Sequence, residues 1–181
     1  MIVKPLPDSW NVIAPGYIQQ PWNEAEVMGA ASWLWLHSGH HLFLPIHSLT
    51  TLLIPAIKHQ QFILISDERQ PIFYMSWAKF NLDAEARYIN QPVLDRQLND
   101  WHSGNRWWIL DWIAPFGHSH QLRNWLQHTY FSHCCFRSLY HRGDEKGLKI
   151  KQFYGKALSA GQAKYWFDSH PVSLNLKQEA N

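Results

Sequence analysis

Histidine is the side chain best suited to move protons near neutral pH, and this chain concentrates it in one short segment. Residues 37–41 read His-Ser-Gly-His-His, and His47 follows shortly afterwards. Because imidazole titrates near neutrality, such a loop is a candidate for acid–base chemistry or metal binding. The chain has 12 histidines, so histidines without a chemical role are the simpler alternative. Spacing alone does not choose His41 over His40 or His37.

A carboxylate stands in one of the most apolar stretches of the chain. Asp111 lies within the run WWILDWI, which is typical of a buried strand. Strict alternation puts Asp111 on the same face as Trp107, Ile109 and Ile113. An ionised carboxylate among such neighbours is costly unless it is paired, so it needs a cationic or hydrogen-bonding partner. Asp111 is therefore a candidate functional residue, and a structural pairing with Arg106 or a backbone N–H is the alternative.

Other reactive side chains lack the surroundings of known catalytic motifs. Ser38 precedes a histidine by three residues, but no G-x-S-x-G elbow surrounds it. Cys134 and Cys135 are sequence neighbours, which is a poor basis for a disulfide and more typical of core positions. No cysteine or acidic residue stands at ligand-like spacing from the histidine segment, so we expect no metal. The glycines form neither a phosphate-binding loop nor a dinucleotide fingerprint.

Alternating helical and strand-like segments must position these residues. Asn23 and Glu26 have the spacing of a capping box before a helical pattern over residues 25–36. Because successive strands with short connections favour antiparallel pairing, we predict a mixed α/β (α+β) fold with a mostly antiparallel sheet flanked by helices. The other expected elements are helices at 46–58 (with Pro55 near the end), 81–89, 93–101, 118–130 and 159–169, a hairpin of 62–66 with 71–78, and strands at 107–113, 135–141 and 148–154.

Composition indicates one folded domain. The 181 residues are 46% hydrophobic, include 11 Trp and carry only 17% charged side chains, which excludes disorder for the bulk of the chain. A net charge of +2 is too small to imply nucleic-acid binding. No apolar run reaches the roughly 18 residues of a membrane span, and the first residues lack a secretory signal. We expect a soluble, cytoplasmic protein with an extended arm at 1–22, one domain at 23–170 and a tail at 171–181.

A series of short motifs follows in order along the chain. They are SWLW at 32–35, His41, IPAI at 54–57, SWA at 76–78, NL at 81–82, RY at 87–88, DWHSGNR at 100–106 and WILDWIAPFG at 108–117. This order resembles the lysine acyltransferases that activate RTX toxins, the hemolysin-activating family, over about residues 25–160. The run from Asp111 to Gly117 is long and unusual in composition, so the resemblance is specific.

The resemblance implies a GNAT-like acyltransferase fold and a reaction. Members of this family take a fatty acyl group from acyl carrier protein and transfer it to internal lysines of an RTX protoxin. The acyl donor is then a phosphopantetheine thioester, with no permanently bound cofactor. The family's essential histidine falls on His41, its essential aspartate on Asp111 and a further serine on Ser38, while Arg106 is a possible supporting residue. The family, together with the Trp content, also implies a homodimer.

Two mechanisms remain open for His41. It either removes a proton from the attacking lysine or forms an acyl-imidazole, with Asp111 as the orienting or charge-stabilising partner in both cases. Two rival functions also remain, a GNAT-like enzyme that uses acyl-CoA on a small amine and a toxin-binding module without chemistry. The missing glycine-rich pyrophosphate loop favours a carrier-protein donor. An acidic carrier protein would dock on basic side chains, for which the candidates are Arg123, Arg137, Arg142, Lys149 and Lys151.

The chain departs from the family pattern at several positions around these motifs. Leu42 stands where a basic residue is usual, Asn105 where the turn has an acid, and His118 where an acid follows the Phe-Gly pair. Tyr154-Gly155-Lys156 replaces His-Gly-Gly. None of these positions is catalytic, so the departures concern the substrate loops, the acyl preference and the toxin partner.

Overall fold

One sheet forms the centre of the computed structural model, which describes residues 5–91, 97–139 and 149–172. It has six strands in the order of the sequence, and every pairing is antiparallel except β4 with β5. This confirms the predicted mixed α/β, GNAT-like fold with a mostly antiparallel sheet. The strands are β1 (Asn11–Ile13), β2 (Phe62–Ser66), β3 (Pro71–Phe80), β4 (Arg106–Ile113), β5 (Cys135–Leu139) and β6 (Ile150–Tyr154).

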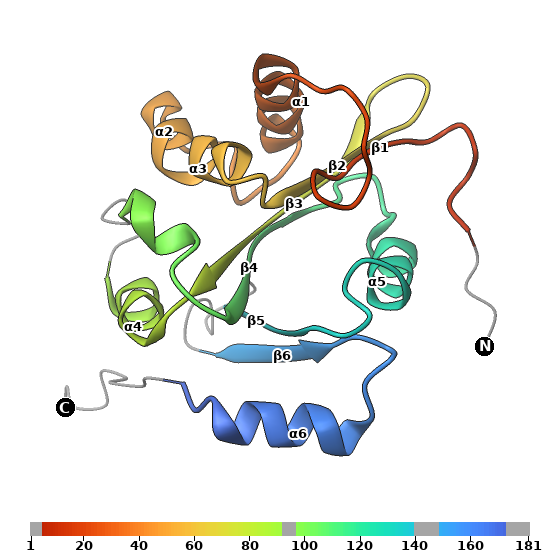
Figure 1. Ribbon diagram of the computed structural model, residues 1–181. Coiled ribbons are helices and arrows are strands. Elements are labelled where there is room, and N and C mark those ends of the chain that lie inside the picture. Colours follow the sequence, from red (N-terminus) through yellow and green to blue (C-terminus); the bar gives the residue numbers. More distant parts are fainter. Residues whose placement is uncertain (1–4, 92–96, 140–148, 173–181) are drawn as a thin grey trace.

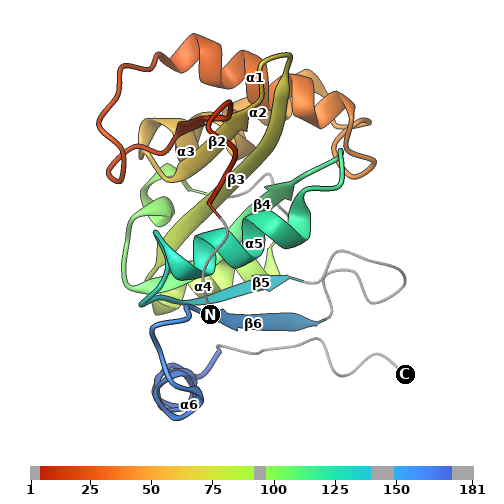
Figure 2. The same cartoon turned by 90° about the vertical axis from the view of Figure 1, so that its right-hand side faces the viewer.

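Helices cover both faces of the sheet (Figures 1 and 2). The first four pack on one face, where they bury two apolar clusters, and α5 closes the other face with a third cluster. Helix α6 contacts β5 at the end of the sheet formed by β5 and β6. The helices are α1 (Glu24–Leu36), α2 (Leu49–Leu52), α3 (Ile54–Lys58), α4 (Leu82–Asn90), α5 (Ser119–His128) and α6 (Ala160–Ser169), with 3-10 turns at Ile46–Ser48 and Leu98–Trp101.

Side-chain caps fix where three helices begin. The Asn23 carboxamide oxygen accepts from the Glu26 N–H at 2.8 Å, as its spacing predicted, and Asn81 caps α4 in the same way. Ser159 and Gln162 form a reciprocal capping box at the start of α6. Such caps satisfy backbone donors that the first helical turn leaves free, so the sequence determines these starting points locally.

A bulge in the β3–β4 pairing decides which way Asp111 points. Ser76 pairs with Asp111, but the next residue, Trp77, pairs with Ile109, so Leu110 has no residue opposite it. A bulge of this kind reverses the alternation of the bulged strand. The prediction that Asp111 shares a face with Trp107 and Ile109 was therefore wrong, because those side chains pack against the α5 side of the sheet.

Other differences from the expected elements have local causes. The helix expected over 46–58 is a 3-10 turn followed by α2 and α3, and it breaks just before Pro55, which has no N–H to continue the ladder. The arm gains the edge strand β1, which the sequence did not indicate. Of the helix expected at 93–101 the structure shows only the 3-10 turn Leu98–Trp101. Residues 92–96, 140–148 and 173–181, with the turn expected at 142–147, lie outside the described residues.

Candidate functional site

His41 and Asp111, seventy positions apart in the sequence, meet on the α1 face of the sheet. The His41 Nε2 lies 3.2 Å from the Asp111 Oδ1. The two side chains are 16% and 11% exposed, so they are shielded from bulk water without being sealed off. This geometry allows an imidazole–carboxylate pair to exchange protons with a bound substrate.

Two serine hydroxyls extend this pair at both ends. The Ser38 Oγ lies 2.9 Å from the His41 Nδ1, and the Ser76 hydroxyl donates to the Asp111 Oδ2 at 2.6 Å. A carboxylate can only accept hydrogen bonds, so the His41 Nε2 must carry the proton that Asp111 accepts. The Nδ1 is then the basic nitrogen of the neutral ring, and it faces Ser38.

The loop after α1 presents His41. The His41 and Leu42 N–H groups both donate to the Ser38 carbonyl at 2.9 Å, which folds the chain into a tight turn. The Trp35 ring of α1 lies 5.0 Å from the His41 ring, centroid to centroid, and supports it from below. The bulge on β4 then aims Asp111 at this turn, so a local turn and a sheet irregularity together assemble the pair.

A cavity of about 520 Å³ opens beside the His41–Asp111 pair. β5 pairs with β4 only as far as Ser138 and Ile109, so the two strands separate there and the cavity occupies the space. Most of its wall is apolar, as expected for a site that holds a hydrocarbon chain. The apolar lining side chains are Leu44, Pro45, Leu52, Met75, Ile109, Leu110, Trp112, Leu126, Phe131, Phe136 and Phe153.

Polar groups reach the cavity from α5 and from the open edge of β4. Ser119, Arg123 and Gln127 of α5 lie along its wall, and Arg123 is the one Lys or Arg among the described lining residues. Beyond Ile109 the backbone groups of β4 that face β5 have no strand partner among the residues that the structure describes. The cavity can therefore offer a cationic side chain and backbone donors to a polar substrate segment.

The phenol of Tyr74 lies near the acidic end of this site. Burial raises its pKa well above the ordinary value, and the negative charge of Asp111 raises it further. Tyr74 therefore stays neutral beside Asp111. Burial likewise raises the pKa of the Cys134 and Cys135 thiols, which are free. Raised thiol pKa values disfavour the reactive thiolate, which agrees with a packing role.

Comparison with known proteins decides the family. A scan against models of protein families matches residues 20–154 to the RTX toxin acyltransferase family. The chain belongs to the RTX toxin acyltransferase family. It is 39% identical to the protein-lysine myristoyltransferase RtxC of Kingella kingae over 85% of this chain and 92% of that relative. It is 37% identical to the leukotoxin-activating lysine-acyltransferase LktC serotype A11 of Mannheimia haemolytica (86% of this chain, 93% of that relative) and 34% identical to the RTX-I toxin-activating lysine-acyltransferase ApxIC of Actinobacillus pleuropneumoniae (88% and 92%).

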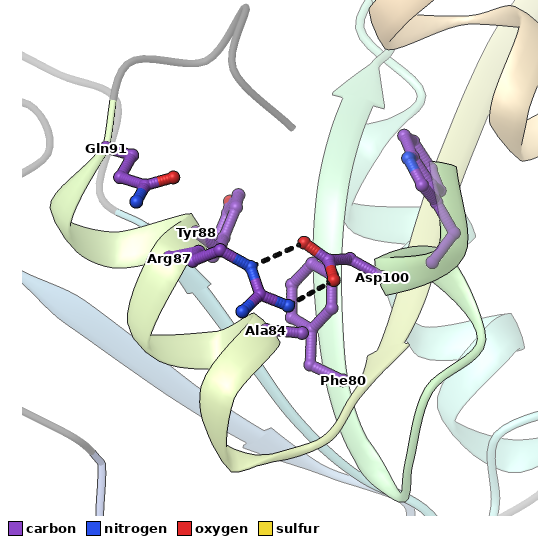
Figure 3. Close-up of a pocket in the computed structure, with 7 residues that line it drawn as sticks. Phe80, Ala84, Arg87, Tyr88, Gln91 and Asp100 are labelled. Carbon is purple, nitrogen blue, oxygen red and sulfur yellow. Dashed lines mark hydrogen bonds and ion pairs between the residues drawn. The ribbon is translucent and has the colours of Figure 1, made fainter. Parts of the chain in front are cut away.

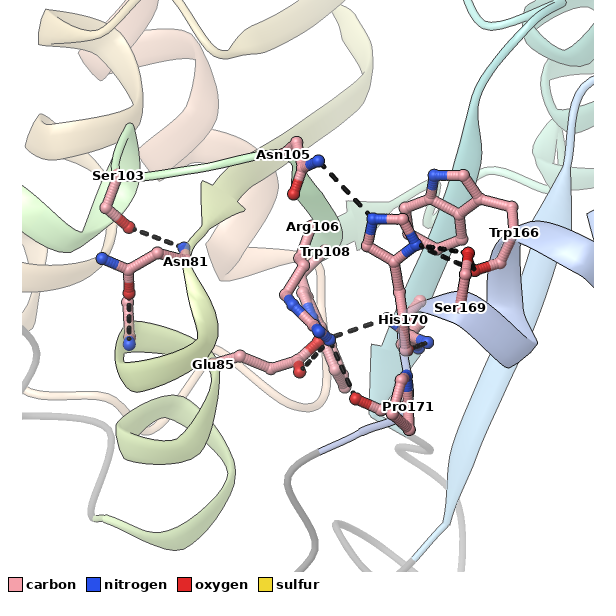
Figure 4. A network of polar contacts seen from close by, with 12 residues as sticks. Asn81, Glu85, Ser103, Asn105, Arg106, Trp108, Trp166, Ser169, His170 and Pro171 are labelled. Atoms are coloured by element: carbon pink, nitrogen blue, oxygen red, sulfur yellow. Dashed lines mark hydrogen bonds and ion pairs between the residues drawn. The ribbon is translucent and has the colours of Figure 1, made fainter.

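Arg106 does not join the site of this RTX toxin acyltransferase family member. Its guanidinium donates to the Glu85 carboxylate at 2.8 Å and to the Pro171 carbonyl at 2.9 Å (Figure 4). Glu85 also accepts from the Trp108 indole at 2.7 Å and pairs with Arg137 at 3.3 Å. Arg106 therefore ties α4 to the chain that follows α6, and it does not pair with Asp111.

A second, smaller pocket lies between α4 and the 3-10 turn Leu98–Trp101 (Figure 3). Arg87 and Asp100 close it with a two-pronged ion pair, and its volume of about 10 Å³ has room for roughly one water molecule. Within the described residues no group of three His, Cys, Asp or Glu could hold a metal ion. Nor is any helix there long and apolar enough to cross a membrane.

Four side chains form one hydrogen-bonded series, Ser38, His41, Asp111 and Ser76. Sequence reasoning singled out the first three of them. It missed Ser76, whose hydroxyl is fully buried and bound to Asp111. The available signal was a serine within the apolar run PIFYMSWAKF, the same kind of anomaly that marked Asp111. A polar residue inside a buried strand needs a partner, and here the two anomalies are each other's partners.

Proposed function

We propose that this chain is a protein-lysine fatty acyltransferase that moves an acyl group from acyl carrier protein to lysine side chains of an RTX protoxin. The observation that carries the proposal is the position of the His41–Asp111 pair on the wall of a largely apolar cavity of about 520 Å³. Membership of the RTX toxin acyltransferase family supports the reaction class. The Kingella relative is named as a myristoyltransferase, which agrees with a long-chain donor.

The first chemical requirement is a neutral lysine. With a pKa of about 10.4, only about one lysine amine in 2,500 is neutral at pH 7, so attack on a thioester needs a base. In the proposal His41 first passes a proton from the lysine ammonium to the solvent, and it then accepts a second proton from the nitrogen as the neutral amine attacks the thioester carbonyl carbon. A C–N bond forms and the C–S bond breaks. The departing thiolate takes the proton from the His41 imidazolium, so the enzyme returns to its starting state.

The hydrogen bonds of His41 suggest the route of that proton. Asp111 accepts from the Nε2, so the Nδ1 is the nitrogen that receives the proton, either directly or through the Ser38 hydroxyl. Asp111 stabilises the imidazolium formed in this step. An acyl-imidazole mechanism would need the same Nδ1 lone pair as nucleophile, with the Ser38 hydroxyl displaced. Proton transfer needs no such displacement and is the mechanism we propose.

Arg123 and the open edge of β4 support a phosphopantetheine donor. Arg123 is exposed on α5 and also lines the cavity, where it can bind the phosphate at the outer end of the pantetheine arm. The backbone of β4 beyond Ile109, which has no strand partner in the described part of the chain, can bind the amides of the arm and the thioester oxygen. The arm would then pass between β4 and β5, and the acyl chain would lie against the apolar wall.

The proposed partners are acyl carrier protein, the lysine-bearing segments of an RTX protoxin and a second copy of this chain. Free thiols at Cys134 and Cys135 fit a reducing compartment, so we place the reaction in the cytoplasm. Light scattering after size-exclusion chromatography tests self-association, and a monomeric mass at all concentrations would contradict the proposed homodimer.

Co-expression tests the proposed reaction. The chain would be expressed with acyl carrier protein and an RTX protoxin fragment, and the fragment analysed by intact and peptide mass spectrometry. We expect fatty-acyl mass increments on lysines with the wild type and with His47→Ala, which removes an exposed histidine of the same segment. His41→Ala is expected to abolish the increments. Undiminished acylation by His41→Ala would contradict the proposed base.

Three further measurements separate the alternatives. Activity with acyl-CoA and a small amine, but not with acyl carrier protein, would favour a different GNAT-like transferase. A folded wild type that binds the fragment without modifying it would favour a non-enzymatic binding module. An acyl group trapped on His41 with the donor alone would support the acyl-imidazole mechanism.

A further inference from the structure

One buried hydroxyl on the cavity wall has no hydrogen-bond partner within the described part of the chain. Ser48 is 1% exposed, and its Oγ makes no hydrogen bond there although its side chain lines the same cavity as His41 and Asp111. A buried hydroxyl without a partner destabilises a fold, because folding removes the hydrogen bonds that the hydroxyl makes with water in the unfolded chain. A fold that keeps such a group on the wall of the cavity that also holds the His41–Asp111 pair can use it for a ligand.

The neighbours of Ser48 limit what that ligand can be. Leu44, Pro45 and Leu52 form the cavity wall around it, and all three are apolar. A hydrocarbon chain can pack against such a wall, but it has no hydrogen-bond acceptor for the Ser48 hydroxyl. An acyl group has one acceptor near its reacting end, the carbonyl oxygen. Among the groups that enter the cavity, this oxygen matches a hydroxyl donor set in an apolar wall.

We propose that the Ser48 hydroxyl donates a hydrogen bond to the acyl carbonyl oxygen and stabilises the oxyanion formed during transfer. This inference rests on the proposed acyltransferase function and names a further catalytic residue for it. When the lysine amine attacks, the electron pair of the C=O bond moves onto this oxygen, and it returns when the C–S bond breaks. Ser48 gains and loses no proton in this cycle, because it only donates a hydrogen bond to the developing charge.

Ser48 complements the two groups already assigned to the site. His41 removes the proton from the amine, and Asp111 holds the imidazole. Neither of them can neutralise the charge on the carbonyl oxygen. In this arrangement backbone N–H groups of β4 would contact the oxygen from the sheet, and Ser48, the last residue of the 3-10 turn Ile46–Ser48, would contact it from the opposite wall of the cavity. Donors on two sides of the oxygen fix its position as well as its charge.

Kinetics of matched hydroxyl variants test the role of Ser48. The variants are Ser48→Ala, Ser48→Cys and Thr50→Ala, the last of which removes an exposed hydroxyl two residues away. Full-length protein would be assayed with acyl carrier protein loaded with a myristoyl group and the protoxin fragment, with His41→Ala as the inactive reference. We expect Ser48→Ala to lower kcat about 100-fold with little change in the KM for the fragment. Ser48→Cys should fall in between because a thiol is a weak donor, and Thr50→Ala should match the wild type.

Thermal unfolding separates this role from a structural one. Removing a buried, unpartnered hydroxyl should leave the Tm of Ser48→Ala unchanged or raise it, while kcat falls. A kcat for Ser48→Ala within twofold of the wild type would overturn the inference while leaving the proposed function intact. So would a lowered Tm with proportional loss of kcat. If Ser48→Ala does not fold, Ser48→Cys decides alone, and wild-type kcat in that variant overturns the role. No acylation by the wild type would overturn both proposals.

Discussion

Charged side chains lie at both ends of strand β4, in an enclosed cluster at one end and beside a cavity at the other. At its beginning, Arg106 and the Trp108 indole bind Glu85, which also pairs with Arg137. Towards its end, Asp111 binds the His41 imidazole and the Ser76 hydroxyl, next to a cavity. The first group is nearly inaccessible, with Glu85 and Arg137 both fully buried, whereas the second keeps partial access. One strand thus carries an enclosed ion-pair cluster at one end and the proposed reactive site at the other.

The difference lies in whether the partners can change their protonation. A guanidinium stays charged near neutral pH; burial lowers the pKa of Arg137, and the nearby Glu85 carboxylate offsets only part of this lowering. An imidazole can both accept and release a proton during a reaction, and a carboxylate bound to it stabilises the cationic ring. Ion pairs between groups that stay charged can hold elements together. A carboxylate paired with an imidazole can instead take part in proton transfer.

Asp111→Asn gives the largest expected effect and breaks the reactive end. The carboxamide keeps the shape of the side chain but can present an N–H to the His41 Nε2, which favours the wrong tautomer. We expect acylation to fall by about 10²- to 10⁴-fold. Single-turnover acylation of a protoxin fragment, followed by mass spectrometry, measures this. Circular dichroism should show an intact fold, and a variant that retains at least half of the wild-type rate would remove Asp111 from the mechanism.

Glu85→Gln breaks the anchoring end. It leaves Arg106 and Arg137 buried beside a neutral amide, so we expect the free energy of unfolding to fall by about 3–5 kcal/mol. Glu24→Gln is the matched control, because Glu24 pairs with Lys58 on the surface at 2.7 Å and should contribute less than about 1 kcal/mol. Urea unfolding measures both. At a temperature where the Glu85 variant is folded, its kcat should equal that of the wild type. A loss of kcat in the folded variant would contradict the assignment of Glu85 to stability alone.

For the end of β4 near Asp111, the sequence indicated which residues matter but not how they are arranged in space. His41 and Asp111 stood out because a cluster of imidazoles and a carboxylate in an apolar run are unusual, and the hairpin and the helix start at Asn23 followed from local signals. The bulge that turns Asp111 towards His41 left no such signal. It depends on how β3 and β4 pair, which is a property of two segments together.

The anchoring end was harder to predict for a related reason. Arg106 was expected to support the site, because it lies close to Asp111 in the sequence and matches the family pattern. In the structure its partner, Glu85, comes from the exposed-looking helical sequence LDAEARYIN. Nothing in that sequence shows that the helix packs its glutamate beneath the sheet. β1 escaped prediction because a strand of three residues is too short for periodicity.

Ser76→Ala sharpens the description of the reactive end. The Ser76 hydroxyl donates to the Asp111 Oδ2 at 2.6 Å, and a hydrogen bond to a charged group contributes about 1.5–3 kcal/mol. Without it Asp111 can rotate away from His41, so kcat/KM should fall about 10- to 100-fold. Ser138→Ala, which also alters the cavity wall, is the control and should stay within twofold. Equal losses in both variants would mean that cavity shape, and not the orientation of Asp111, sets the rate.

Arg106→Lys gives the smallest expected effect and tests the boundary between the two ends. One guanidinium nitrogen of Arg106 donates both to Glu85 and to the Pro171 carbonyl. A lysine ammonium has enough donors for both bonds, but its shorter side chain and compact charge place them less well. We expect a loss of about 1 kcal/mol in the free energy of unfolding and an unchanged kcat. The reverse pattern, a tenfold or larger loss of kcat at wild-type stability, would assign Arg106 to catalysis, as its position in the family motif implies. In that case the permanent ion pairs would act on the reaction through β4, and the strand would be one functional unit.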